Sequence, residues 1–360
     1  MKVLIEGSTL FTKGYTGIPH YILCLHKALK KNSKIDVFLA YNIKKIKNLK
    51  NNKVTIKHLW YFKKTLFSFK HQPTISHSLH TPFLEIRGSK KIATIHDLAV
   101  HLPEFSEYNF SSEYFKKKRL HLFKTFSENA DAIIAVSENT KKDFLKFFDY
   151  PAEQIHVIHL APVFKPKNDD IEENDSFLDT FLIKKHNYYL SVGGVSLRKN
   201  SFNLLKGFHL SGKSEKHKLV FAGKIASDEK TKLDYYIKEN QLEGQIIFTN
   251  YISDDHLAIL YKNAKAFLFP TYYEGFGIPI IEAMIYNLPV LTSITGAAPE
   301  IANNHAVLVN PFSEKEIAEG IHRLDSITHA HLEKAKNYAS TFTWDKVAKE
   351  TIKVYESLAK

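Results

Sequence analysis

The sequence predicts an α/β protein built from two tandem, doubly wound domains with parallel sheets. Its 360 residues exceed the roughly 250–300 residues at which single hydrophobic cores stop growing. Short runs rich in β-branched and aromatic residues alternate with segments of helical periodicity, which is typical of parallel βαβ units. An acidic stretch that contains prolines interrupts this alternation once, and the alternation then resumes. We therefore expect two sheets, each covered by helices on both faces.

The first domain is predicted over residues 1–165. Its first helix is expected over residues 18–29, from the spacing of the apolar residues. Ser137-Glu-Asn-Thr140 follows the last predicted strand and has the composition of a helix N-terminus. The strands predicted in this domain cover residues 2–5, 35–40, 75–79, 91–96 and 132–136.

A polar linker is predicted over residues 166–184, and the second domain over residues 185–342. Residues 343–360 are expected to form a C-terminal helix that crosses back to the N-terminal domain, and the apolar spacing supports a helix from 344 to 358. The strands predicted in the second domain cover residues 188–192, 218–222, 245–248, 266–269, 290–292 and 306–309.

The composition, with 44% hydrophobic and 24% charged residues, is that of an ordinary globular protein. No apolar run approaches the ~20 residues that a membrane-spanning helix needs. The N-terminal residues are typical of a first strand rather than of a signal peptide. The single cysteine, Cys24, excludes an intrachain disulfide and an all-cysteine metal site. We expect the protein in the cytoplasm or peripherally on the inner face of the cytoplasmic membrane.

The formal charge of +12 is concentrated in the N-terminal half. Residues 1–160 contain 26 Lys and Arg against 13 Asp and Glu, whereas the other 200 residues contain 24 against 25. One explanation is a solvated, lysine-rich surface. The other is contact with an anionic partner such as phospholipid headgroups, a lipid-phosphate acceptor or nucleic acid.

Residues 114–126 present the same two alternatives, because basic and aromatic side chains are interleaved there. The segment could pack into the domain beneath solvated lysines, or it could lie on a membrane surface. We do not expect nucleic acid as a partner. The side chains that could pack are Phe115, Leu120, Leu122, Phe123 and Phe126.

Two carboxylates, Glu274 and Glu282, lie in a stretch of the second half that is otherwise apolar. Glu274-Gly-Phe-Gly-Ile278 follows a predicted strand, and Pro279 suits the first turn of a helix. Ligands of parallel sheets bind at such turns, where glycines allow close approach and helix N–H groups favour an anion. Carboxylates beside an anion site are suited to accept hydrogen bonds from hydroxyl groups. A nucleotide-sugar, which joins a diphosphate to sugar and ribose hydroxyls, fits both features.

Three further candidates lie at expected sheet edges. Arg198 and Lys199 follow the strand at 188–192 and suit a diphosphate leaving group, although such a pair is usually a solvated surface. His96 ends a predicted strand, where a lone histidine is more often a hydrogen-bonded structural residue. Gly17 precedes the first helix and offers another anion contact.

Together these motifs resemble the GT4 family of retaining, nucleotide-sugar-dependent glycosyltransferases with the GT-B fold. The chain is similar in particular to bacterial mannosyl- and rhamnosyl-type enzymes of surface polysaccharide assembly. The resemblance spans residues 16 to 300, in the family's order. The matching residues are Thr16-Gly17-Ile18, Thr94-Ile-His-Asp97, Ala135-Val-Ser-Glu138, Val192-Gly-Gly194, Arg198-Lys-Asn200, Glu274-Gly-Phe-Gly-Ile-Pro279, Glu282-Ala283 and Ala298-Pro-Glu300.

The resemblance implies a role for each candidate. Arg198 and Lys199 would neutralise the donor diphosphate, and Gly17 would approach it from the facing domain. Glu282 would hold the ribose hydroxyls. No metal is expected, and no cofactor beyond the nucleotide-sugar co-substrate. The catalytic residues implied are His96, beside the transferred sugar, Glu274, which would hold the sugar hydroxyls, and Arg198 and Lys199. The backbone implied to cap phosphate and sugar is that of Gly275, Phe276, Gly277 and Ile278.

The chain departs from the family at three places. Gly193-Gly194 stands where many members have Gly-Arg, and Tyr286-Asn287 where a small pair such as Cys-Gly is usual. Thr249-Asn250 follows a strand at a turn that usually ends in glycine. These differences concern the seating of the nucleotide rather than the reaction class.

The hypothesis from the sequence is a retaining hexosyltransferase. It would move a hexose, with mannose from GDP-mannose as first choice, onto a growing, lipid-linked saccharide in polysaccharide or lipopolysaccharide biosynthesis. In the family the leaving phosphate is thought to help deprotonate the acceptor in a front-face attack. The donor base and sugar, the linkage, the acceptor and the oligomeric state stay open at this point.

Three alternatives are a GT-B nucleotide-sugar epimerase, a phosphorylase and a catalytically inactive GT-B partner subunit. A phosphorylase would need a cofactor lysine and a much longer chain. An epimerase would need no basic acceptor domain. Retention of all the candidate side chains argues against an inactive subunit.

Overall fold

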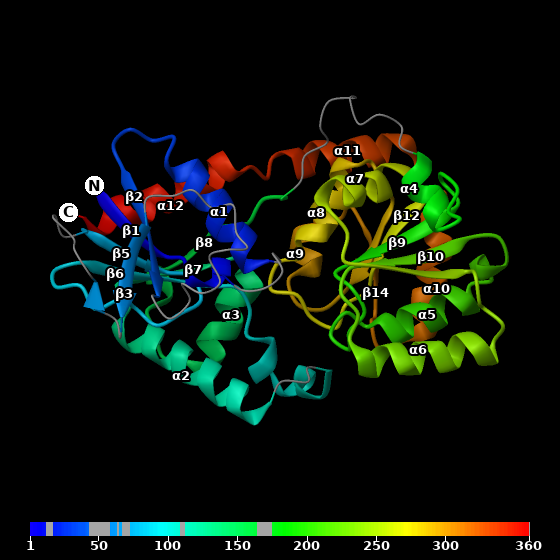
Figure 1. Cartoon of the computed structure of the whole chain (residues 1–360), viewed down its shortest axis with the longest axis horizontal. Helices are drawn as coiled ribbons and strands as arrows, with labels where there is room; N and C mark the ends of the chain where they lie inside the picture. Colours follow the sequence, from blue (N-terminus) through cyan, green and yellow to red (C-terminus); the bar gives the residue numbers. More distant parts are fainter. Residues whose placement is uncertain are drawn as a thin grey trace. The chain divides into compact units, whose positions relative to one another are not determined.

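The computed structural model describes residues 1–11, 17–42, 58–62, 65–66, 73–108, 112–163 and 175–359. The chain forms two compact units, each an α/β layer structure (Figure 1). The first unit consists of Met1–Leu98, Ser111–Ala161 and Phe342–Lys360, and the second of Ala99–Phe110 and Pro162–Thr341. The predicted fold class, two doubly wound α/β domains, is confirmed.

An eight-stranded sheet forms the centre of the first unit, in the order β4-β3-β2-β1-β5-β6-β7-β8. Neighbouring strands are parallel, except that β3 and β4 pair antiparallel at one edge. The sequence pattern does not predict β3, β4 and β8, of which β4 and β8 have only two and three residues. The strands are β1 Lys2–Glu6, β2 Asp36–Asn42, β3 His58–Phe62, β4 Thr65–Leu66, β5 Ile75–Ser78, β6 Lys90–Ile95, β7 Ala132–Ala135 and β8 Ile155–Val157.

Helices cover both faces of this sheet (Figure 1). Helix α1 (Ile18–Leu29) packs against α12 (Trp344–Leu358) on one face, and α2 (Glu113–Asn129) and α3 (Glu138–Phe147) lie on the other. Side chains of a strand alternate between faces. Thr94 of β6 accordingly approaches Tyr21 of α1, whereas its neighbours join a core that contains Phe123 of α2.

Serine hydroxyls cap two helix N-termini, of which the sequence predicts one. The hydroxyl of Ser137 accepts a hydrogen bond from the Thr140 N–H at 3.0 Å and caps α3, as the sequence predicts. The hydroxyl of Ser112 caps α2 in the same way, through the Phe115 N–H. Each cap satisfies one backbone donor that the helix itself leaves without a partner.

The second unit contains a six-stranded, fully parallel sheet in the order β11-β10-β9-β12-β13-β14. All six strands are predicted from the sequence, three of them with the same bounds and the other three with ends that differ by at most two residues. They are β9 Tyr188–Val192, β10 Lys218–Ala222, β11 Ile246–Asn250, β12 Ala266–Phe269, β13 Val290–Ser293 and β14 Val307–Val309.

The helices of the second unit also form two layers (Figure 1). One layer shares an apolar core with the sheet, around Leu205, Phe221 and Ile317. This layer consists of α5 Ser201–Leu210, α6 Ser227–Glu239 and α10 Glu314–Arg323. The other consists of α7 Asp254–Asn263, α8 Ile278–Ile285 and α11 His329–Ser340.

The strand order reverses between β9 and β12. From β9 the chain runs outward through β10 to β11, and it then returns through α7 to β12 on the other side of β9. The connections that leave these two neighbouring strands therefore diverge. Such a switch point opens a crevice beyond the carboxyl ends of the strands, where ligands of parallel sheets bind.

Three segments differ from the sequence prediction. The expected linker 166–184 contains helix α4 (Asp175–Thr180) in its described part, and Phe177 of this helix stacks on His256 with ring centroids 4.1 Å apart. Residues 99–110 group with the second unit, although they precede the predicted boundary. On α2, Leu122, Phe123 and Phe126 are buried as expected, but Phe115 and Leu120 are exposed. In the part of the chain that the structure describes, no helix is long and apolar enough to cross a membrane.

Candidate active site

Two loops meet at the switch point of the second sheet, residues 193–200 after β9 and residues 270–277 after β12. The side-chain amide of Asn200 joins them, because its nitrogen donates to the Pro270 carbonyl at 2.8 Å and to the Pro311 carbonyl at 2.6 Å. The Tyr272 N–H donates to the Arg198 carbonyl at 3.2 Å. The position of the first loop is therefore fixed by the second.

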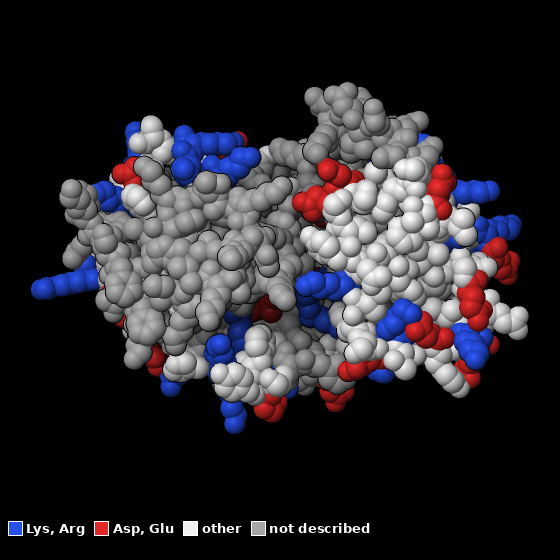
Figure 2. Space-filling model, in the orientation of Figure 1, with Lys and Arg blue, Asp and Glu red and all other residues white. Residues whose placement is uncertain are grey.

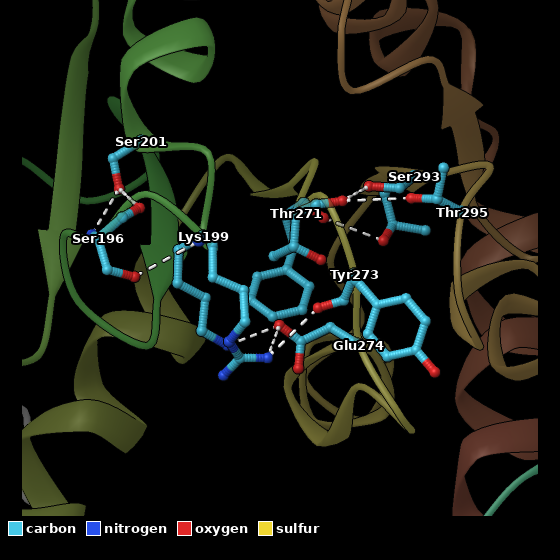
Figure 3. A network of polar contacts seen from close by, with 11 residues as sticks. Ser196, Lys199, Ser201, Thr271, Tyr273, Glu274, Ser293 and Thr295 are labelled. Atoms are coloured by element: carbon cyan, nitrogen blue, oxygen red, sulfur yellow. Dashed lines mark hydrogen bonds and ion pairs between the residues drawn. The ribbon is translucent and has the colours of Figure 1, made fainter. Parts of the chain in front are cut away.

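Three predicted site residues come together here (Figure 3). The Nζ of Lys199 donates to Oε1 of Glu274 at 2.8 Å, and Nη1 of Arg198 lies 3.3 Å from the same oxygen. Nη1 of Arg198 also donates to the Tyr273 carbonyl at 3.3 Å. Glu274 is only 9% exposed. Two cations from one loop thus converge on a buried carboxylate from the other.

The charges of this cluster determine its ionisation. Burial by itself would raise the pKa of Glu274, but the charges of Arg198 and Lys199, and their hydrogen bonds, hold that pKa below its ordinary value. Glu274 is therefore ionised at neutral pH. Because two cations face one anion, the cluster retains one positive charge, which suits a polyanionic ligand.

The exit of β13 supports the loop that carries Glu274 (Figure 3). The hydroxyl of Ser293 donates to the Thr271 carbonyl, and that of Thr295 donates to the Tyr272 carbonyl at 2.8 Å. The Ala297 N–H donates to the Glu274 carbonyl at 2.9 Å. The backbone of the loop is thus bonded on both sides of Glu274.

Gly194 explains one departure from the family pattern. Its φ is +83°, and a Cβ added there would lie 1.9 Å from the Lys224 carbonyl oxygen. Real carbon and oxygen atoms do not approach so closely, so no side chain fits. The arginine that many family members carry at this place is therefore excluded by the approach of the neighbouring loop.

The two other departures preserve the backbone conformation of a glycine. Asn250, which ends β11, has φ +58°, and Asn287, which follows α8, has φ +62°. Asparagine adopts this left-handed region more readily than other residues with side chains. Both turns therefore have the left-handed backbone conformation that a glycine would adopt, although the glycine of the family is absent.

Helix α8 begins directly at the glycine-rich turn. Gly277 is its N-cap with φ +96°, and Ile278 and Pro279 form its first turn. Gly275 and Phe276 are buried in the turn itself. The first N–H groups of a helix have no partner within it and favour an anion.

Glu282 lies on α8 with partners different from those of Glu274. It is 3% exposed, its Oε1 accepts from the Val163 N–H at 3.2 Å, and its Oε2 accepts from the Tyr261 hydroxyl at 3.2 Å. Burial, and then the charge of Glu282, raise the pKa of Tyr261 well above its ordinary value, so the hydroxyl remains a donor. The structure thus brings Glu274, but not Glu282, into direct contact with the two cations.

His96 and Gly17 belong to the first unit. His96 follows β6, is half-buried, and has an Nε2 without a hydrogen-bond partner among the described residues. Its pKa is lowered to about 4, mainly by burial, with Asp97 opposing and Arg119 adding to the effect, so the ring is neutral at pH 7. Gly17 is exposed at the N-cap of α1 with φ +57°, and Tyr15 and Thr16 before it lie outside the described residues.

Sequence reasoning misses an aromatic cluster beside the Glu274 loop. The segment with helices η3 (Ala99–His101) and η4 (Pro103–Tyr108) packs against this loop. The ring centroids of Tyr108 and Tyr272 lie 4.0 Å apart, and those of Phe105 and Tyr273 lie 5.1 Å apart. The aromatic residues of 103–108 were the available signal, but nothing local in the sequence names their partners.

The described ranges contain no group of three or more His, Cys, Asp or Glu side chains placed to hold a metal ion.

Comparisons with known proteins agree with this fold. A family model described as "Glycosyltransferase Family 4" matches residues 13–161, and one described as "Glycosyl transferases group 1" matches residues 173–341. The chain is 26% identical over 289 residues to the O-antigen chain mannosyltransferase B of Escherichia coli, covering 77% of this chain and 72% of that protein. It is 25% identical over 366 residues to the O-antigen chain mannosyltransferase RfbU of Salmonella typhimurium, covering 95% and 96%.

Among solved structures, the Anabaena protein HepE in complex with UDP and glucose has the same fold, with a TM-score of 0.73 at 16% identity and coverage of 99% of this chain and 100% of that one. The two family models together account for most of the sequence, in the order of the two units. The chain therefore belongs to the family 4 glycosyltransferases with the GT-B fold, and it is a glycosyltransferase.

Proposed function

We propose that this glycosyltransferase moves mannose from GDP-mannose, with retention of the anomeric configuration, onto a lipid-linked saccharide. The observation that carries the proposal is the convergence of Arg198 and Lys199 on Glu274 at the switch point. This edge offers cations for a diphosphate and a carboxylate for sugar hydroxyls within one cluster. A nucleoside diphosphate sugar requires cations at its diphosphate and a hydrogen-bond acceptor at the adjoining sugar.

The donor diphosphate is assigned to Arg198, Lys199 and the first N–H groups of α8. Negative charge grows on the diphosphate as the glycosidic bond breaks, so preorganised cations and amide dipoles stabilise the transition state more than the ground state. The backbone of Gly275, Phe276, Gly277 and Ile278 closes over the phosphate and the sugar.

Glu274 and Glu282 take different hydroxyl groups. Glu274 accepts hydrogen bonds from the transferred sugar, and its charge also favours the positive character that develops at the anomeric carbon. Glu282 accepts from the ribose. Its two oxygens already hold Tyr261 and Val163, but each carboxylate oxygen has two lone pairs, so further acceptance is available.

His96 and Gly17 contribute from the first unit. A neutral imidazole can donate to a hydroxyl of the sugar, and the low pKa of His96 keeps it neutral. Gly17 contacts the diphosphate through its backbone. The acceptor hydroxyl loses its proton to the leaving phosphate on the same face of the sugar, so no protein nucleophile is needed.

The choice of mannose and of a lipid-linked acceptor rests on the relatives and on the surface. Two relatives are named as O-antigen mannosyltransferases. Figure 2 shows Lys and Arg side chains gathered over α1 and α12, whereas acidic and basic side chains are mixed over the second unit. Such a surface suits the anionic headgroups around a lipid diphosphate acceptor.

Helix α2, which lies on the opposite face of the first sheet from α1 and α12, combines basic side chains with exposed apolar ones. In its N-terminal half Tyr114 is 76% exposed, Phe115 41% and Leu120 43%, among four consecutive basic residues at 116–119. Exposed aromatic rings between cationic side chains are typical of segments that rest at the interface of a membrane. We therefore assign the lipid-facing surface to the N-terminal half of α2.

The proposal is tested by a transfer assay with GDP-mannose, UDP-glucose, ADP-glucose and dTDP-rhamnose and a lipid-linked saccharide acceptor. We expect transfer from GDP-mannose, with NMR of the product showing the anomeric configuration of the donor. An inverted product contradicts retention. Transfer only from another donor contradicts the choice of mannose. Conversion of GDP-mannose into a different nucleotide-sugar, without transfer to the acceptor, contradicts the assignment as a transferase that uses this donor.

A further inference from the structure

Four buried polar side chains form a continuous path through the core of the first unit. The Tyr355 hydroxyl on α12 lies 2.7 Å from Nδ1 of His77 on β5, and Nε2 of His77 lies 2.8 Å from the Thr94 hydroxyl on β6. The Thr94 hydroxyl lies 3.5 Å from the hydroxyl of Tyr21 on α1. All four residues are at most 3% exposed. We call them the polar chain.

The polar chain ends at His96. The ring of Tyr21 meets the ring of His96 edge-on, with centroids 4.9 Å apart and an interplanar angle of 83°. The ring of Trp344, at the start of α12, packs against the same tyrosine, with ring centroids 5.8 Å apart. Nε2 of His96 has no hydrogen-bond partner among the described residues, so the imidazole is held by a hydrogen bond to the Leu79 backbone and by its edge-on contact with Tyr21.

Stability alone does not explain a polar chain in this place. Each buried polar group loses its hydration and needs a partner in return, and apolar residues of the same shape often serve a core as well or better. Helix α12 already buries Val347, Val354 and other apolar side chains against the unit. A chain of hydrogen bonds also constrains the orientation of its side chains, because each bond requires a narrow range of angles between donor and acceptor.

The state of His77 makes this constraint strict. A neutral imidazole donates through one nitrogen and accepts through the other, and both nitrogens of His77 are engaged. Loss of either hydroxyl therefore leaves a buried nitrogen without a partner. Such a group would recover a partner only by turning the ring, which would disturb the rest of the polar chain.

We propose that Tyr355, His77, Thr94 and Tyr21 are positioning residues for His96, and that through them the C-terminal helix α12 takes part in the transfer step. The inference rests on the role of His96 in the proposed function. It adds that the orientation of this imidazole depends on side chains of α1, β5, β6 and α12, of which only Thr94 is near His96 in the sequence.

The test uses full-length Thr94→Val and Tyr355→Phe variants, each of which removes one hydroxyl and keeps the shape. Misplacement of a reacting group by about 1 Å can cost up to about a hundredfold, so we expect kcat to fall about tenfold. The KM for the donor should change much less than kcat, because the two cations assigned to the diphosphate, Arg198 and Lys199, lie in the second unit. Thr94→Ser, which restores the hydroxyl, should recover most of the lost turnover.

Thr351→Val is the matched control. Thr351 is buried one turn before Tyr355 on α12, and its hydroxyl donates to the Val347 carbonyl of its own helix at 2.8 Å. The substitution is the same and the helix is the same, but this hydroxyl is not part of the polar chain. Thr351→Val should shift the melting temperature without the fall in kcat.

A spectroscopic readout connects the variants to His96. In protein labelled with 15N-histidine, the ring resonances of His96, assigned with His96→Gln, should move in Thr94→Val and Tyr355→Phe and remain in place in Thr351→Val. A fall in kcat with unmoved His96 resonances would mean that the hydroxyls act by another route and would overturn the inference.

The role of His96 is checked separately with His96→Ala. If His96→Ala is impaired while Thr94→Val and Tyr355→Phe keep full turnover, the role of His96 stands and the polar chain loses its function. If His96→Ala itself keeps full turnover, the role of His96 in the proposed function is wrong, and the positioning inference is overturned with it.

Discussion

The Nζ of Lys199 lies 2.8 Å from Oε1 of Glu274, although the two residues are 75 positions apart in the sequence. They meet because β9 and β12 are neighbours in the sheet and because both loops leave the same edge. The pair is shielded from water, with 14% of the lysine side chain and 11% of the glutamate side chain exposed. An ion pair in such a place costs desolvation that a surface pair avoids. We interpret it as part of a binding site rather than as a source of stability.

Glu274→Ala and Lys199→Ala should therefore keep the fold and lose turnover by at least about a hundredfold, the range found when one preorganised electrostatic group is removed from a transition-state site. The measurement is kcat/KM for the donor, with circular dichroism to check the fold.

The matched control for this prediction is Lys206→Ala. Lys206 pairs with Glu314 at 3.1 Å in the same unit, between α5 and α10. Removal of this partly exposed pair should change stability by less than about 1 kcal/mol and leave turnover in place. Full activity of Glu274→Ala or Lys199→Ala would show that the site is assigned wrongly.

Gly194→Ala should destabilise the second unit and abolish donor binding. Its Cβ would lie 1.9 Å from the Lys224 carbonyl oxygen, so one of the two loops must move. Gly212→Ala is the control, because Gly212 also has a positive φ, +67°, but nothing lies within 4 Å of an added Cβ. That variant carries only the backbone strain, about 1–2 kcal/mol. Equal melting temperatures for the two variants would contradict the close approach of the loops.

Stability should fall as the pH drops below about 6.5, because histidines that are neutral when buried must be protonated on unfolding. The pKa of His77 is lowered from 6.5 to about 3, mainly by burial, with His96 adding to the effect. The unfolded chain thus binds the proton more readily between pH 6.5 and 3, so this contribution is complete above pH 6.5 and is lost below it. Its slope is about 1.4 kcal/mol per pH unit.

Melting temperatures between pH 7.5 and 5 check this contribution. His77→Gln cannot be protonated, so the variant should be less stable at pH 7.5 but lose less on acidification than the wild type. His329→Gln, at a histidine whose side chain is 81% exposed, should follow the wild-type curve. Parallel curves for His77→Gln and the wild type would contradict the assigned pKa.

Membrane contact through α2 predicts that Tyr114→Ser with Phe115→Ser weakens binding to vesicles that contain anionic phospholipid. Burial of an aromatic side chain contributes about 1.5–3 kcal/mol, so the loss should exceed about tenfold in co-sedimentation. Binding should also weaken as salt screens the lysines.

Tyr235→Ser serves as the control for the membrane prediction, because Tyr235 on α6 is 66% exposed but belongs to the second unit. It should bind vesicles like the wild type. Absence of vesicle binding, or binding that salt does not affect, would remove α2 from the account.

The sequence predicts the sheets well because buried parallel strands are continuous apolar runs. Residues 188–192 and 266–269 are examples, and both are strands within a residue of the predicted ends. Short strands such as Ile155–Val157 contain too few residues for a pattern. Helix α4 lies in a polar stretch, and the stacking of its Phe177 on His256 is a contact that no local pattern reveals.

The candidate site could be predicted in its residue types but not in its contacts. The sequence predicts Arg198, Lys199 and Glu274 because each follows a strand at one sheet edge, and the structure brings them together. Both cations pair with the same carboxylate oxygen, Oε1 of Glu274. This contact depends on the conformations of the two loops, which the sequence does not indicate. Asn200, which joins these loops, was recognised as part of a motif, but its bonds to two proline carbonyls required the fold.

Glu282 and the polar chain lie beyond what the sequence indicates. The sequence places Glu282 near Glu274, yet Glu282 accepts hydrogen bonds from Tyr261 and Val163, which the sequence does not indicate. The polar chain joins side chains of α1, β5, β6 and α12, and three of the four carry no motif. Such long-range polar contacts leave no periodic signature in the sequence.

The central claim is that the edge formed by Arg198, Lys199 and Glu274 binds a nucleoside diphosphate sugar. The most direct measurement is the melting temperature of the wild type and of Lys199→Ala with GDP-, UDP-, ADP- and dTDP-sugars, since a ligand that binds only the folded state stabilises it by mass action. We predict that GDP-mannose raises the melting temperature of the wild type and has little effect on Lys199→Ala. A wild type that responds to none of these donors, or a variant that responds as strongly as the wild type, would contradict the account.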